Sequence, residues 1–496
     1  MMQKKIKKIL LIFPPVVFSR ESPKQIMPPL GISYLAAYLG SEYEVKLLDA
    51  ALAGYHSERR LDTQFRVYGL KKEEIKKKIQ EFSPDVVGVS CLYSSQFYQV
   101  QDVCAAAKEL SRDIITVIGG THPTFLGAEC MKFADIDFIV LGEGEKTFHK
   151  LLCCLNQNED CGTIDGLIFR KDGKIVTNPK TDWIDNLDEL PFPARRKLPL
   201  NEYFRINLPM GLLARRTPAM NIITSRGCPF KCSFCSSSRF WGGKYRGRSA
   251  ENVLDEMAHL KKDLGVRELK FFDDNLTYLP ARAREIFQGM IGRNFKFSWN
   301  TPNGIDIHTL DEEIIRLMKQ SGCYELTLAI ESGDEKVLKN IIKKPFDLAK
   351  IAETARIIKR NGIDTYGFFI IGFPGETKRQ IQNTLNFIDR LGLDRISLFI
   401  ANPLPGTEIY DVCLKKGYLR TGAPSYFDYF NSRIQTEEFD SEYLLMLRHK
   451  YYWNYNLKLF LRNPLKFIRK YSIFIKRPLF LAKMLYAKLF IPGLKR

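Results

Sequence analysis

The chain has 496 residues, of which 45% are hydrophobic and 26% charged, and its formal net charge is +19. This length and composition are typical of two or three globular domains with cores of their own. The first apolar run, residues 9–13, is too short for a signal peptide or a membrane span. Eleven unevenly spaced cysteines favour a reducing, cytoplasmic location over a disulfide framework.

Residues 1–150 alternate strand and helix patterns. The run KILLIF (8–13) is apolar throughout, as expected of a parallel strand that is buried on both faces. Further strands are predicted at 43–50, 85–92, 114–120 and 137–145, and helices at 27–40, 71–82 and 96–111. Repeated units of this kind predict an α/β fold, a doubly wound Rossmann-like domain that binds ligands beyond the carboxyl ends of its strands.

Two segments with different patterns follow this domain. Residues 151–212 contain a predicted β-hairpin with Asp172 and Gly173 at its turn, and then a proline-rich connector. Residues 213–410 resume the alternation, with one helix predicted to begin after Ser249 as its N-cap. The strands of this part are predicted at 221–225, 268–275, 297–304, 325–333, 365–376 and 394–406. They predict a partial (β/α) TIM-type barrel with its site at the carboxyl ends of the strands.

The segment SRGCPFKCSFC (225–235) follows the first barrel strand and holds three cysteines. Cys228, Cys232 and Cys235 are spaced C-x3-C-x2-C, and thiolates are the soft ligands that iron–sulfur clusters use. Zinc and inert buried thiols are the other interpretations. A zinc site normally closes with four ligands, whereas the nearest histidine here, His259, lies 24 residues on. We therefore predict a four-iron cluster that leaves one iron open to a substrate or cofactor.

The cysteine loop, with Phe234 before its last cysteine, resembles that of the radical S-adenosylmethionine (SAM) superfamily. The longer run SRGCPFKCSFCSSSRFWGGKYRGRSAENVLDEM (225–257) is similar to the subgroup that has an N-terminal cobalamin-binding domain. The resemblance implies that Cys228, Cys232 and Cys235 are the catalytic residues that hold a [4Fe-4S] cluster, whose open iron binds SAM. One electron from an external low-potential donor would then cleave SAM to a 5′-deoxyadenosyl radical.

The same resemblance assigns SAM contacts to the ends of several barrel strands. Glu331 and Ser332 correspond to the segment near the SAM ribose, and Gly372 to the glycine segment beside the adenine. Asp273 and Asp274 stand where the family contacts the SAM amino group. The predicted SAM-binding residues are Phe234, Asp273, Asp274, Asn303, Glu331, Ser332 and Gly372, with Asn300 and Arg248 as further candidates. Helix caps, ordinary turns and, for Arg248, a surface position are the alternative interpretations.

Strand ends of the N-terminal domain resemble those of cobalamin-binding domains, where small residues leave room for the nucleotide tail of the cofactor. The predicted cobalamin-binding residues are Ser90, Leu92, Gly119, Gly120, His122, Gly142 and Glu143. Many such domains supply a histidine ligand to cobalt after the first strand, but here that place reads FPPVVF. We therefore predict cobalamin without a protein histidine ligand, and place His122 in a loop beside the corrin.

Residues 411–496 differ from the rest in charge and in pattern. After Glu442 no acidic residue occurs, and 13 Lys or Arg lie in the last 54 residues. The stretches 441–471 and 475–491 are helical in pattern, with aromatic and basic residues interleaved, and neither is apolar enough to span a bilayer. Three interpretations stay open: peripheral contact with an anionic membrane at its inner face, a helix packed on the barrel, and nucleic-acid binding.

Together these features predict a cobalamin-dependent radical SAM enzyme. By resemblance, it would methylate an unactivated carbon of a small-molecule or lipid-like substrate with the methyl group of methylcobalamin. A cyclase, oxidase or rearrangement enzyme of the same architecture is the alternative within the family. A non-enzymatic cobalamin sensor is the alternative of another class, and the cysteine loop disfavours it. Nucleic acid is not an expected partner, because no separate RNA-binding module is recognised.

Overall fold

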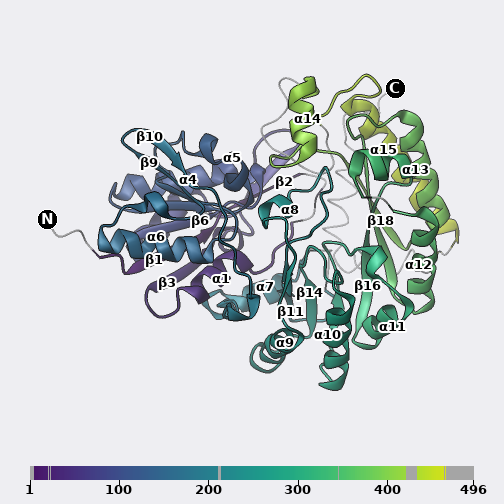
Figure 1. Ribbon diagram of the computed structural model, residues 1–496, viewed down its shortest axis with the longest axis horizontal. Helices are drawn as coiled ribbons and strands as arrows, with labels where there is room; N and C mark the ends of the chain where they lie inside the picture. Colours follow the sequence, from purple (N-terminus) through teal and green to yellow (C-terminus); the bar gives the residue numbers. More distant parts are fainter. Residues whose placement is uncertain are drawn as a thin grey trace.

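Two α/β units lie side by side in the computed structural model (Figure 1). The structure describes residues 5–19, 22, 24–210, 214–344, 346–419, 433–462 and 464. The N-terminal unit, purple to blue in Figure 1, is built on a seven-stranded sheet, and the second unit, teal to green, on a six-stranded sheet. The predicted fold class, a Rossmann-like domain followed by a partial barrel, is confirmed.

The N-terminal sheet has the strand order β10-β9-β8-β7-β6-β1-β3. Its strands are β1 (Lys8–Phe13), β3 (Glu44–Asp49), β6 (Val86–Ser90), β7 (Ile115–Gly119), β8 (Phe138–Val140), β9 (Leu167–Lys171) and β10 (Lys174–Thr177). Strands β3, β1, β6, β7 and β8 are parallel, whereas β9 and β10 run antiparallel at the edge. The hairpin predicted in the connector therefore extends the N-terminal sheet beyond residue 150.

Both faces of this sheet are buried, as the apolar run of β1 predicts. Ile9 and Leu11 belong to one core cluster, and Leu10 and Ile12 belong to another on the opposite face. Helices α1 and α6 contribute to the first cluster, and α3, α4 and α5 to the second. The helices of this unit are α1 (Leu30–Tyr38), α2 (Ala50–Ala53), α3 (Lys72–Phe82), α4 (Phe97–Leu110), α5 (Thr121–Cys130) and α6 (Glu145–Gln157).

A small antiparallel sheet that the sequence did not predict lies beside this unit. Its strands, in the order β2-β5-β4, are β2 (Val16–Ser19), β5 (Phe65–Tyr68) and β4 (Glu58–Arg60). Val17, Phe65 and Val67 form its own small core. The two prolines before β2 end the long parallel strand β1, and the chain then turns into this separate sheet.

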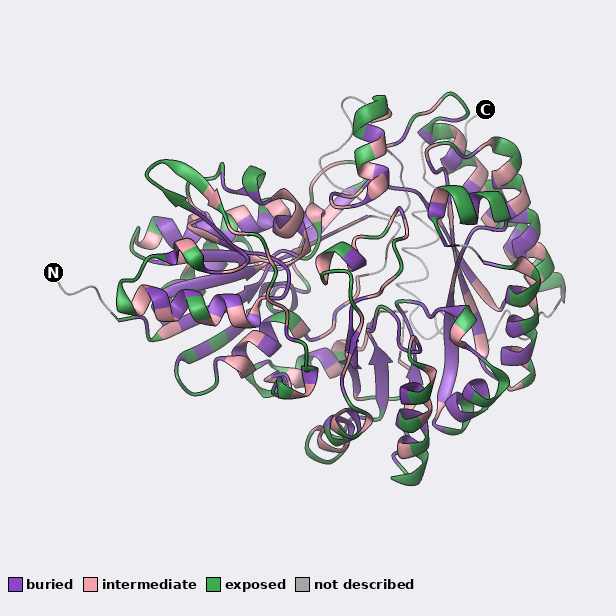
Figure 2. Ribbon diagram, viewed as in Figure 1, coloured by how far each residue is buried: buried purple, intermediate pink, exposed green. Residues whose placement is uncertain are grey.

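The second sheet is parallel throughout and has the order β11-β14-β15-β16-β17-β18, so β11 and β18 are its edges. Its strands are β11 (Ala219–Ile222), β14 (Glu268–Phe271), β15 (Ser298–Asn300), β16 (Cys323–Glu331), β17 (Asp364–Ile371) and β18 (Arg395–Ile400). The helices lie along its outer side (Figure 1), and their inward faces are buried (Figure 2). They are α9 (Ala250–Leu264), α10 (Pro280–Gly292), α11 (Glu312–Gln320), α12 (Leu348–Arg360) and α13 (Lys378–Leu391).

Two helices follow the last strand, α14 (Glu408–Lys416) and α15 (Ser441–Arg462). Helix α15 covers the edge strand β18: Arg448 Nε donates to the carbonyl of Leu398 (2.9 Å), and the hydroxyl of Tyr452 accepts the amide N–H of Leu398 (2.7 Å). Of the three interpretations of the C-terminal region, packing on the barrel holds for this helix. The stretch 475–491 lies outside the described residues, and within them no helix is both long and apolar enough to cross a membrane.

Candidate functional site

The cysteine loop begins just beyond the carboxyl end of β11. Strand β11 ends at Ile222, and a short hairpin follows, made of β12 (Ser225–Arg226) and β13 (Arg246–Gly247). The loop leaves β12 at Gly227, whose φ of +86° is costly for other residues, and a Cβ there would lie 2.2 Å from the carbonyl oxygen of Lys244. Backbone contact between the two arms therefore fixes the entry of the loop, which ends at α8 (Ser237–Phe240).

The three cysteines are partly open to solvent. Cys228 and Cys232 are half-buried and Cys235 is exposed. The surrounding protein raises the pKa of Cys228, that of Cys232 to about 11 and that of Cys235 to about 12, so the free thiols are protonated at neutral pH. Among the described residues, the sulfurs of these three cysteines do not all lie within 4.8 Å of one another, the separation expected of ligands to a single ion. A cubane cluster places each ligand on a different iron, and binding of such a cluster would displace the thiol protons.

Segments from three other places in the barrel hold the loop. The N–H of Ser233 donates to the carbonyl of Ile342 (3.0 Å), and the carbonyl of Ser233 accepts the N–H of Ile409 (3.0 Å). The ring of Phe234 lies 6.0 Å from that of Phe373, in the turn after β17. The residue predicted from the resemblance as a SAM contact therefore joins the loop to the predicted adenine segment.

The two adjacent carboxylates after β14 also hold the loop. Asp273 is buried, and its Oδ1 accepts the hydroxyls of Thr224 and Ser225, both at 2.6 Å. Asp274 accepts the N–H of Gly227, although burial raises its pKa. These bonds anchor the chain on the side from which the cysteine loop starts. The hydrogen-bond partners of both carboxylates are protein groups. The contact of the two carboxylates with the SAM amino group therefore stays a prediction.

The end of β16 presents a buried ion pair beside the cysteines. Glu331 adopts a φ of +70°, and Lys344 Nζ donates to the carbonyl of Ala329 (2.7 Å) and to Glu331 Oε1 (3.3 Å). Burial opposes the charge of Lys344, but Glu331, Cys232 and Asp306 raise its pKa overall. Lys344 was not among the residues predicted from the sequence. Its positive charge lowers the pKa of Cys232.

Ser332 and Gly372 lie at neighbouring strand ends, and both are tied to α13 or to the turn before it. Ser332 Oγ lies 3.0 Å from Thr384 Oγ1. Gly372 has a φ of +85°, and its N–H donates to Oε2 of Glu376 (2.7 Å). Glu376 is fully buried, and burial raises its pKa to about 8, so it is mainly protonated at neutral pH. This acid, which the sequence did not single out, holds the glycine turn.

The further SAM candidates differ in accessibility. Asn303 is exposed, and its Nδ2 donates to the carbonyl of the residue after β14 (2.8 Å). Asn300 is buried, with its Nδ2 3.3 Å from Glu325 Oε1. Arg248 is buried in an ion pair with Glu256. Of these three side chains, only that of Asn303 is open to a ligand.

At the N-terminal sheet, the strands β6 and β7 end side by side. Ser90 and Gly119 are register partners at these ends, and Ser90 is half-buried. Beyond them Leu92 and Tyr93 expose 40% and 47% of their surfaces. Large apolar side chains left open at the carboxyl edge of a parallel sheet are typical of a ligand-binding edge.

Gly120 and His122 continue the same edge after β7. Gly120 has a φ of +111°, and a Cβ there would lie 2.7 Å from the carbonyl oxygen of Cys91, so the position needs glycine for close backbone approach. His122 is buried; its Nδ1 lies 2.9 Å from Ser94 Oγ and its ring 4.7 Å from that of Phe97. Burial lowers the pKa of His122 to about 4, so the ring is neutral at neutral pH.

Glu143 connects the two units rather than facing open solvent. Its carboxylate accepts Arg226 Nη1 (2.5 Å) and Arg246 Nη1 (2.9 Å), one from each strand of the hairpin that carries the cysteine loop. Glu145 accepts the other Nη of Arg226 (2.7 Å). All four side chains are buried. Since Arg226 lies two residues before Cys228, this interdomain cluster ties the loop to the N-terminal sheet. The predicted contact of Glu143 with cobalamin stays a prediction beside these protein partners.

Aromatic rings enclose the interdomain cluster. The guanidinium of Arg226 lies 5.1 Å from the ring of Tyr34 and 5.4 Å from that of Trp241, distances at which cation–π attraction is appreciable. Gly142 packs against a third ring, because a Cβ there would lie 2.9 Å from Trp183. The predicted role of Gly142 in cobalamin binding stays a prediction, and in the protein its small size admits the tryptophan.

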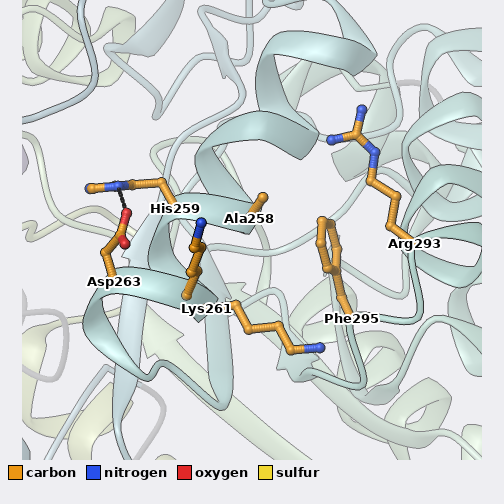
Figure 3. A pocket seen from close by; sticks show the side chains of 7 residues that line it. Ala258, His259, Lys261, Asp263, Arg293 and Phe295 are labelled. Carbon is orange, nitrogen blue, oxygen red and sulfur yellow. Dashed lines mark hydrogen bonds and ion pairs between the residues drawn. The ribbon is translucent and has the colours of Figure 1, made fainter.

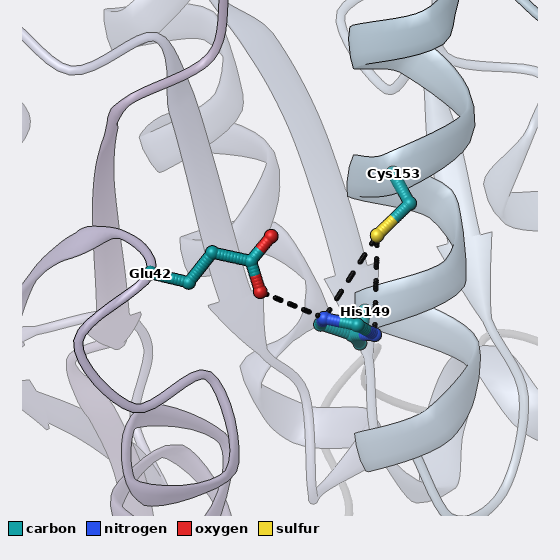
Figure 4. A group of neighbouring side chains, drawn as sticks. All are labelled: Glu42, His149 and Cys153. Carbon is teal, nitrogen blue, oxygen red and sulfur yellow. Dashed lines mark hydrogen bonds and ion pairs between the residues drawn. The ribbon is translucent and has the colours of Figure 1, made fainter.

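A second group of metal-ligating residue types lies on the N-terminal unit (Figure 4). His149 Nε2 is 3.1 Å from Glu42 Oε2, and Cys153 Sγ is 3.8 Å and 4.0 Å from the two ring nitrogens of His149. The sulfur is nearly equidistant from these nitrogens, so it does not lie along the lone pair of either. Within the described residues this group is a hydrogen-bonded pair, Glu42 and His149, with Cys153 beside it on the same helix as His149, rather than a formed metal site.

A shallow hollow on the outside of the barrel is lined by the end of α9 and the residues after α10 (Figure 3). Lys261, Lys262 and Arg293 border it, and His259 is paired with Asp263 (2.6 Å). Helix α9 ends just before β14 begins, so the hollow lies at the amino ends of the strands. It is therefore far along the barrel from the cysteine loop.

Two family models match the chain. The B12 binding domain model matches residues 18–152, and the model of the radical SAM superfamily matches residues 222–388. The first range covers the strand edge that bears Ser90 and Gly119, and the second begins at the last residue of β11, before the cysteine loop. The two regions singled out by the geometry are thus the ones that the family models match.

Curated relatives and solved structures agree with these matches. The chain is 33% identical over 84% of its length to cytidylyl-2-hydroxyethylphosphonate methyltransferase of Streptomyces wedmorensis, of which it covers 83%. It is 28% identical over 77% of its length to the anaerobic magnesium-protoporphyrin IX monomethyl ester cyclase of Rubrivivax gelatinosus, of which it covers 66%. The structure of the radical SAM methyltransferase TsrM from Kitasatospora setae shares the fold, with a TM-score of 0.65 and 19% identity, over 84% of this chain and 76% of that one.

Proposed function

Since the chain belongs to the family of cobalamin-dependent radical SAM enzymes, we propose that it methylates an unactivated carbon of a small-molecule substrate. The relative from Streptomyces wedmorensis is named as a methyltransferase, which supports methyl transfer. One observation carries the proposal: the buried pairing of Arg226 with Glu143 and Glu145. It holds the loop of Cys228 against the unit that the B12 binding domain model matches, so that both cofactor regions meet.

The cluster and SAM would be held at the carboxyl ends of the barrel strands. Cys228, Cys232 and Cys235 would ligate a [4Fe-4S] cluster, with Lys344 offsetting part of the negative charge of the thiolates. Glu331, paired with the buried Lys344 and close to the half-buried Cys232, would accept hydroxyl hydrogen bonds from SAM. When bound, the cluster and SAM supply a 5′-deoxyadenosyl radical, and cobalamin supplies the methyl group.

The remaining predicted SAM contacts would position the nucleoside. Gly372 is buried at the end of β17, where a Cβ would lie 2.5 Å from Leu444 Cδ1, and Glu376 holds that turn by accepting two backbone N–H groups. Ser332 continues the chain from Glu331 and is fixed by Thr384. No general acid or base is needed to abstract hydrogen by a radical, so these residues bind and orient rather than transfer protons.

Cobalamin would lie over the carboxyl edge of β6 and β7. Leu92 and Tyr93 leave apolar surface open there, which a corrin ring would cover. His122 is buried with its Nδ1 2.9 Å from Ser94 Oγ, and cobalamin without a histidine ligand from the protein stays part of this proposal.

Ring formation by a radical is the second candidate, because the relative from Rubrivivax gelatinosus is named as a cyclase. The same cysteine loop and strand ends would serve it. The difference lies in the fate of the substrate radical, and the products of SAM distinguish the two reactions.

The electron donor, the chemical kind of the substrate and the membrane contact also belong to this proposal. An external low-potential reductant would supply the electron, and a lipid-like substrate and peripheral contact with an anionic membrane stay predictions that rest on the basic C-terminal region. In the described part of that region, α15 uses Arg448 and Tyr452 to cover β18. This packing does not support a membrane contact by α15, and the contact stays a prediction for the C-terminal region.

The test uses the full chain, reconstituted anaerobically with iron, sulfide and hydroxocobalamin and supplied with SAM and a low-potential reductant. We expect 5′-deoxyadenosine and S-adenosylhomocysteine from the wild type, and no deoxyadenosine from Cys235→Ala. Cys153→Ala removes a half-buried cysteine of α6 and serves as the matched control, which should form both products. Deoxyadenosine alone would favour the cyclase, and neither product, with cluster and cobalamin bound, would favour a cobalamin sensor.

A further inference from the structure

The last two barrel strands carry half-buried side chains on one face. Burial alternates along β17 and β18: Phe369 and Leu398 are fully buried, whereas the residues between such positions keep part of their surface open (Figure 2). The interior of a fully packed barrel would bury both sets. Asp364 and Arg395 begin this half-buried set, and its other five members, which we call the aromatic wall, are Tyr366, Phe368, Ile370, Ser397 and Phe399.

The aromatic wall faces the inside of the barrel. Arg395 of β18 reaches Glu325 of β16 (2.9 Å) and lies over the ring of Tyr366 on the intervening strand (4.3 Å). Side chains that meet across an intervening strand lie on the concave side of a curved sheet, where they converge. The fully buried residue Phe369 points the other way and belongs to the core beneath the helices.

Below the wall, paired charges close the barrel. Lys270 Nζ is 2.7 Å from Glu268 Oε1, and neither side chain has exposed surface. Arg395 and Glu325 form the second pair of this floor. Two positive and two negative groups cancel, so the floor offers no net charge to attract an anionic substrate.

The wall itself presents ring faces, ring edges and hydroxyls. Phe368 meets Tyr366 and Phe399 edge to face, with centroids 5.1 Å apart in both pairs. Tyr366 Oη lies 2.6 Å from Ser397 Oγ. The hydroxyl pair therefore sits among aromatic rings, on a surface that water can reach.

The wall lies directly below the strand ends that are predicted to bind SAM. Glu331, at the end of β16, is the register partner of Phe369, whose neighbours Phe368 and Ile370 belong to the wall. We propose that the aromatic wall binds the substrate, and that this substrate is a neutral molecule with a flat aromatic or heteroaromatic ring and a hydrogen-bonding edge. The assignment rests on the proposed function, because it places the substrate beside the radical.

Three features favour a flat ring over a lipid chain or an anion. Rings set at right angles accept another ring in stacked and edge-to-face contact, which aliphatic chains cannot make. Ser397 also hydrogen-bonds the hydroxyl of Tyr452, but the Tyr366 hydroxyl retains hydrogen-bonding capacity beyond its bond to Ser397, and an aliphatic chain would exclude water from it without replacing that bond. The cancelled charges of the floor disfavour an anionic group.

Binding of two probes to the reconstituted full chain tests this assignment. Indole represents a flat ring with an N–H edge, farnesol represents a flexible isoprenoid chain, and equilibrium dialysis measures both dissociation constants. We expect indole to bind the wild type, and Phe368→Ala to weaken indole binding about tenfold. Tyr366→Phe keeps the ring and should weaken it about threefold, by loss of one hydroxyl. Trp453→Ala, which removes a ring that is 76% exposed on α15, is the matched control and should change nothing.

The outcomes separate this assignment from the proposed function. If Phe368→Ala does not fold, Phe368→Leu keeps the apolar volume without the ring and should still weaken indole binding severalfold. Equal indole binding by Phe368→Leu and wild type, absence of indole binding to wild type, or wall-dependent binding of farnesol alone would overturn the assignment. Wild type that binds indole at the wall but never cleaves SAM would instead contradict the proposed function.

Discussion

The two parallel sheets of the molecule bury their strands in different ways. Strands β1 and β6 of the N-terminal sheet are buried at nearly every position, because helices cover both faces. Strands β17 and β18 of the barrel are buried on one face and half-open on the other. The N-terminal sheet can therefore meet a ligand only at its carboxyl edge, whereas the barrel offers both an edge and an inner wall.

The chemical groups exposed at the carboxyl edges of the two sheets also differ. The edge of the N-terminal sheet presents apolar surface, through Leu92 and Tyr93, while Gly120 packs against protein backbone. The edge of the barrel presents thiols and the buried pair of Glu331 and Lys344. An apolar edge suits the face of a large ring, and an edge of thiols and charges suits a metal cluster with a polar cofactor.

The largest expected effect lies at the joint between the two sheets. Glu143→Ala would leave Arg226 and Arg246 buried without their carboxylate, and breaking a buried ion pair in this way costs about 3–5 kcal/mol. We expect a clear fall in the urea midpoint of unfolding, and separate melting of the two units if the joint is what couples them.

Glu129→Ala is the matched control for this prediction. Glu129 lies on α5 and its pair with Lys132, just beyond the end of that helix, is exposed, so its removal should change stability by less than about 0.5 kcal/mol. Equal stability of Glu143→Ala and Glu129→Ala would show that the interdomain cluster does not hold the sheets together.

The second effect concerns the end of β17 and depends on pH. Burial raises the pKa of Glu376 from 4.5 to about 8, so the folded protein holds this proton more tightly than the unfolded chain. The resulting stability is fully present below about pH 4.5 and is lost as pH rises to about 8, at about 1.4 kcal/mol per unit of pKa. Glu376→Gln cannot ionise, so its stability relative to wild type should rise between about pH 5 and 8, as urea unfolding across that range would record.

Gln382→Glu serves as the reference for that titration, because it adds a carboxyl to an exposed part of α13 and should leave the pH profile of unfolding unchanged. A pH profile of Glu376→Gln that parallels that of wild type would mean that Glu376 is ionised in the folded protein.

The third effect tests the edge of the N-terminal sheet. Gly120→Ala would force a Cβ to within 2.7 Å of the carbonyl oxygen of Cys91 at a φ of +111°, and such strain costs about 1–3 kcal/mol. We expect weaker cobalamin binding, measured from the absorbance of bound hydroxocobalamin, because the end of β7 must shift. Gly173→Ala, in the open turn of the β9–β10 hairpin, is the control with no neighbouring atom to displace, and retained binding in both variants would contradict the role of this edge.

Much of the fold was predictable from the sequence because its signals are local. The apolar run of β1 and the N-cap at Ser249 predicted elements that the structure contains, and the strand predicted at 221–225 placed the cysteine loop at a strand end. The sheet of β2, β5 and β4 was not predicted, because its strands are short and pair over long separations in sequence. The hydrophobic periodicity of a sequence does not indicate which distant strands pair with each other.

The partners of the site residues were less predictable than their positions. Lys344 follows another lysine, and that pattern is typical of a solvated surface, although tertiary packing buries it beside Glu331. Glu143 lies in a segment that resembles a cofactor site, and only the fold brings Arg226 and Arg246 to it. Charge pairing across about 80 residues or more leaves no mark on the local pattern.

The smallest expected effect lies on the outer edge of the barrel. Tyr452→Phe removes the hydroxyl that accepts the N–H of Leu398, and leaving this edge amide without its acceptor costs about 1–2 kcal/mol. Since β18 has no further strand beside it, its amide should exchange with solvent faster, which hydrogen–deuterium exchange measures. Tyr443→Phe, on the same helix, is the control and should leave exchange in β18 unchanged. Faster exchange confined to β18 would show that the Tyr452 hydroxyl of α15 protects the edge amide of this strand. Unchanged exchange would mean that α15 packs on the barrel without protecting that amide.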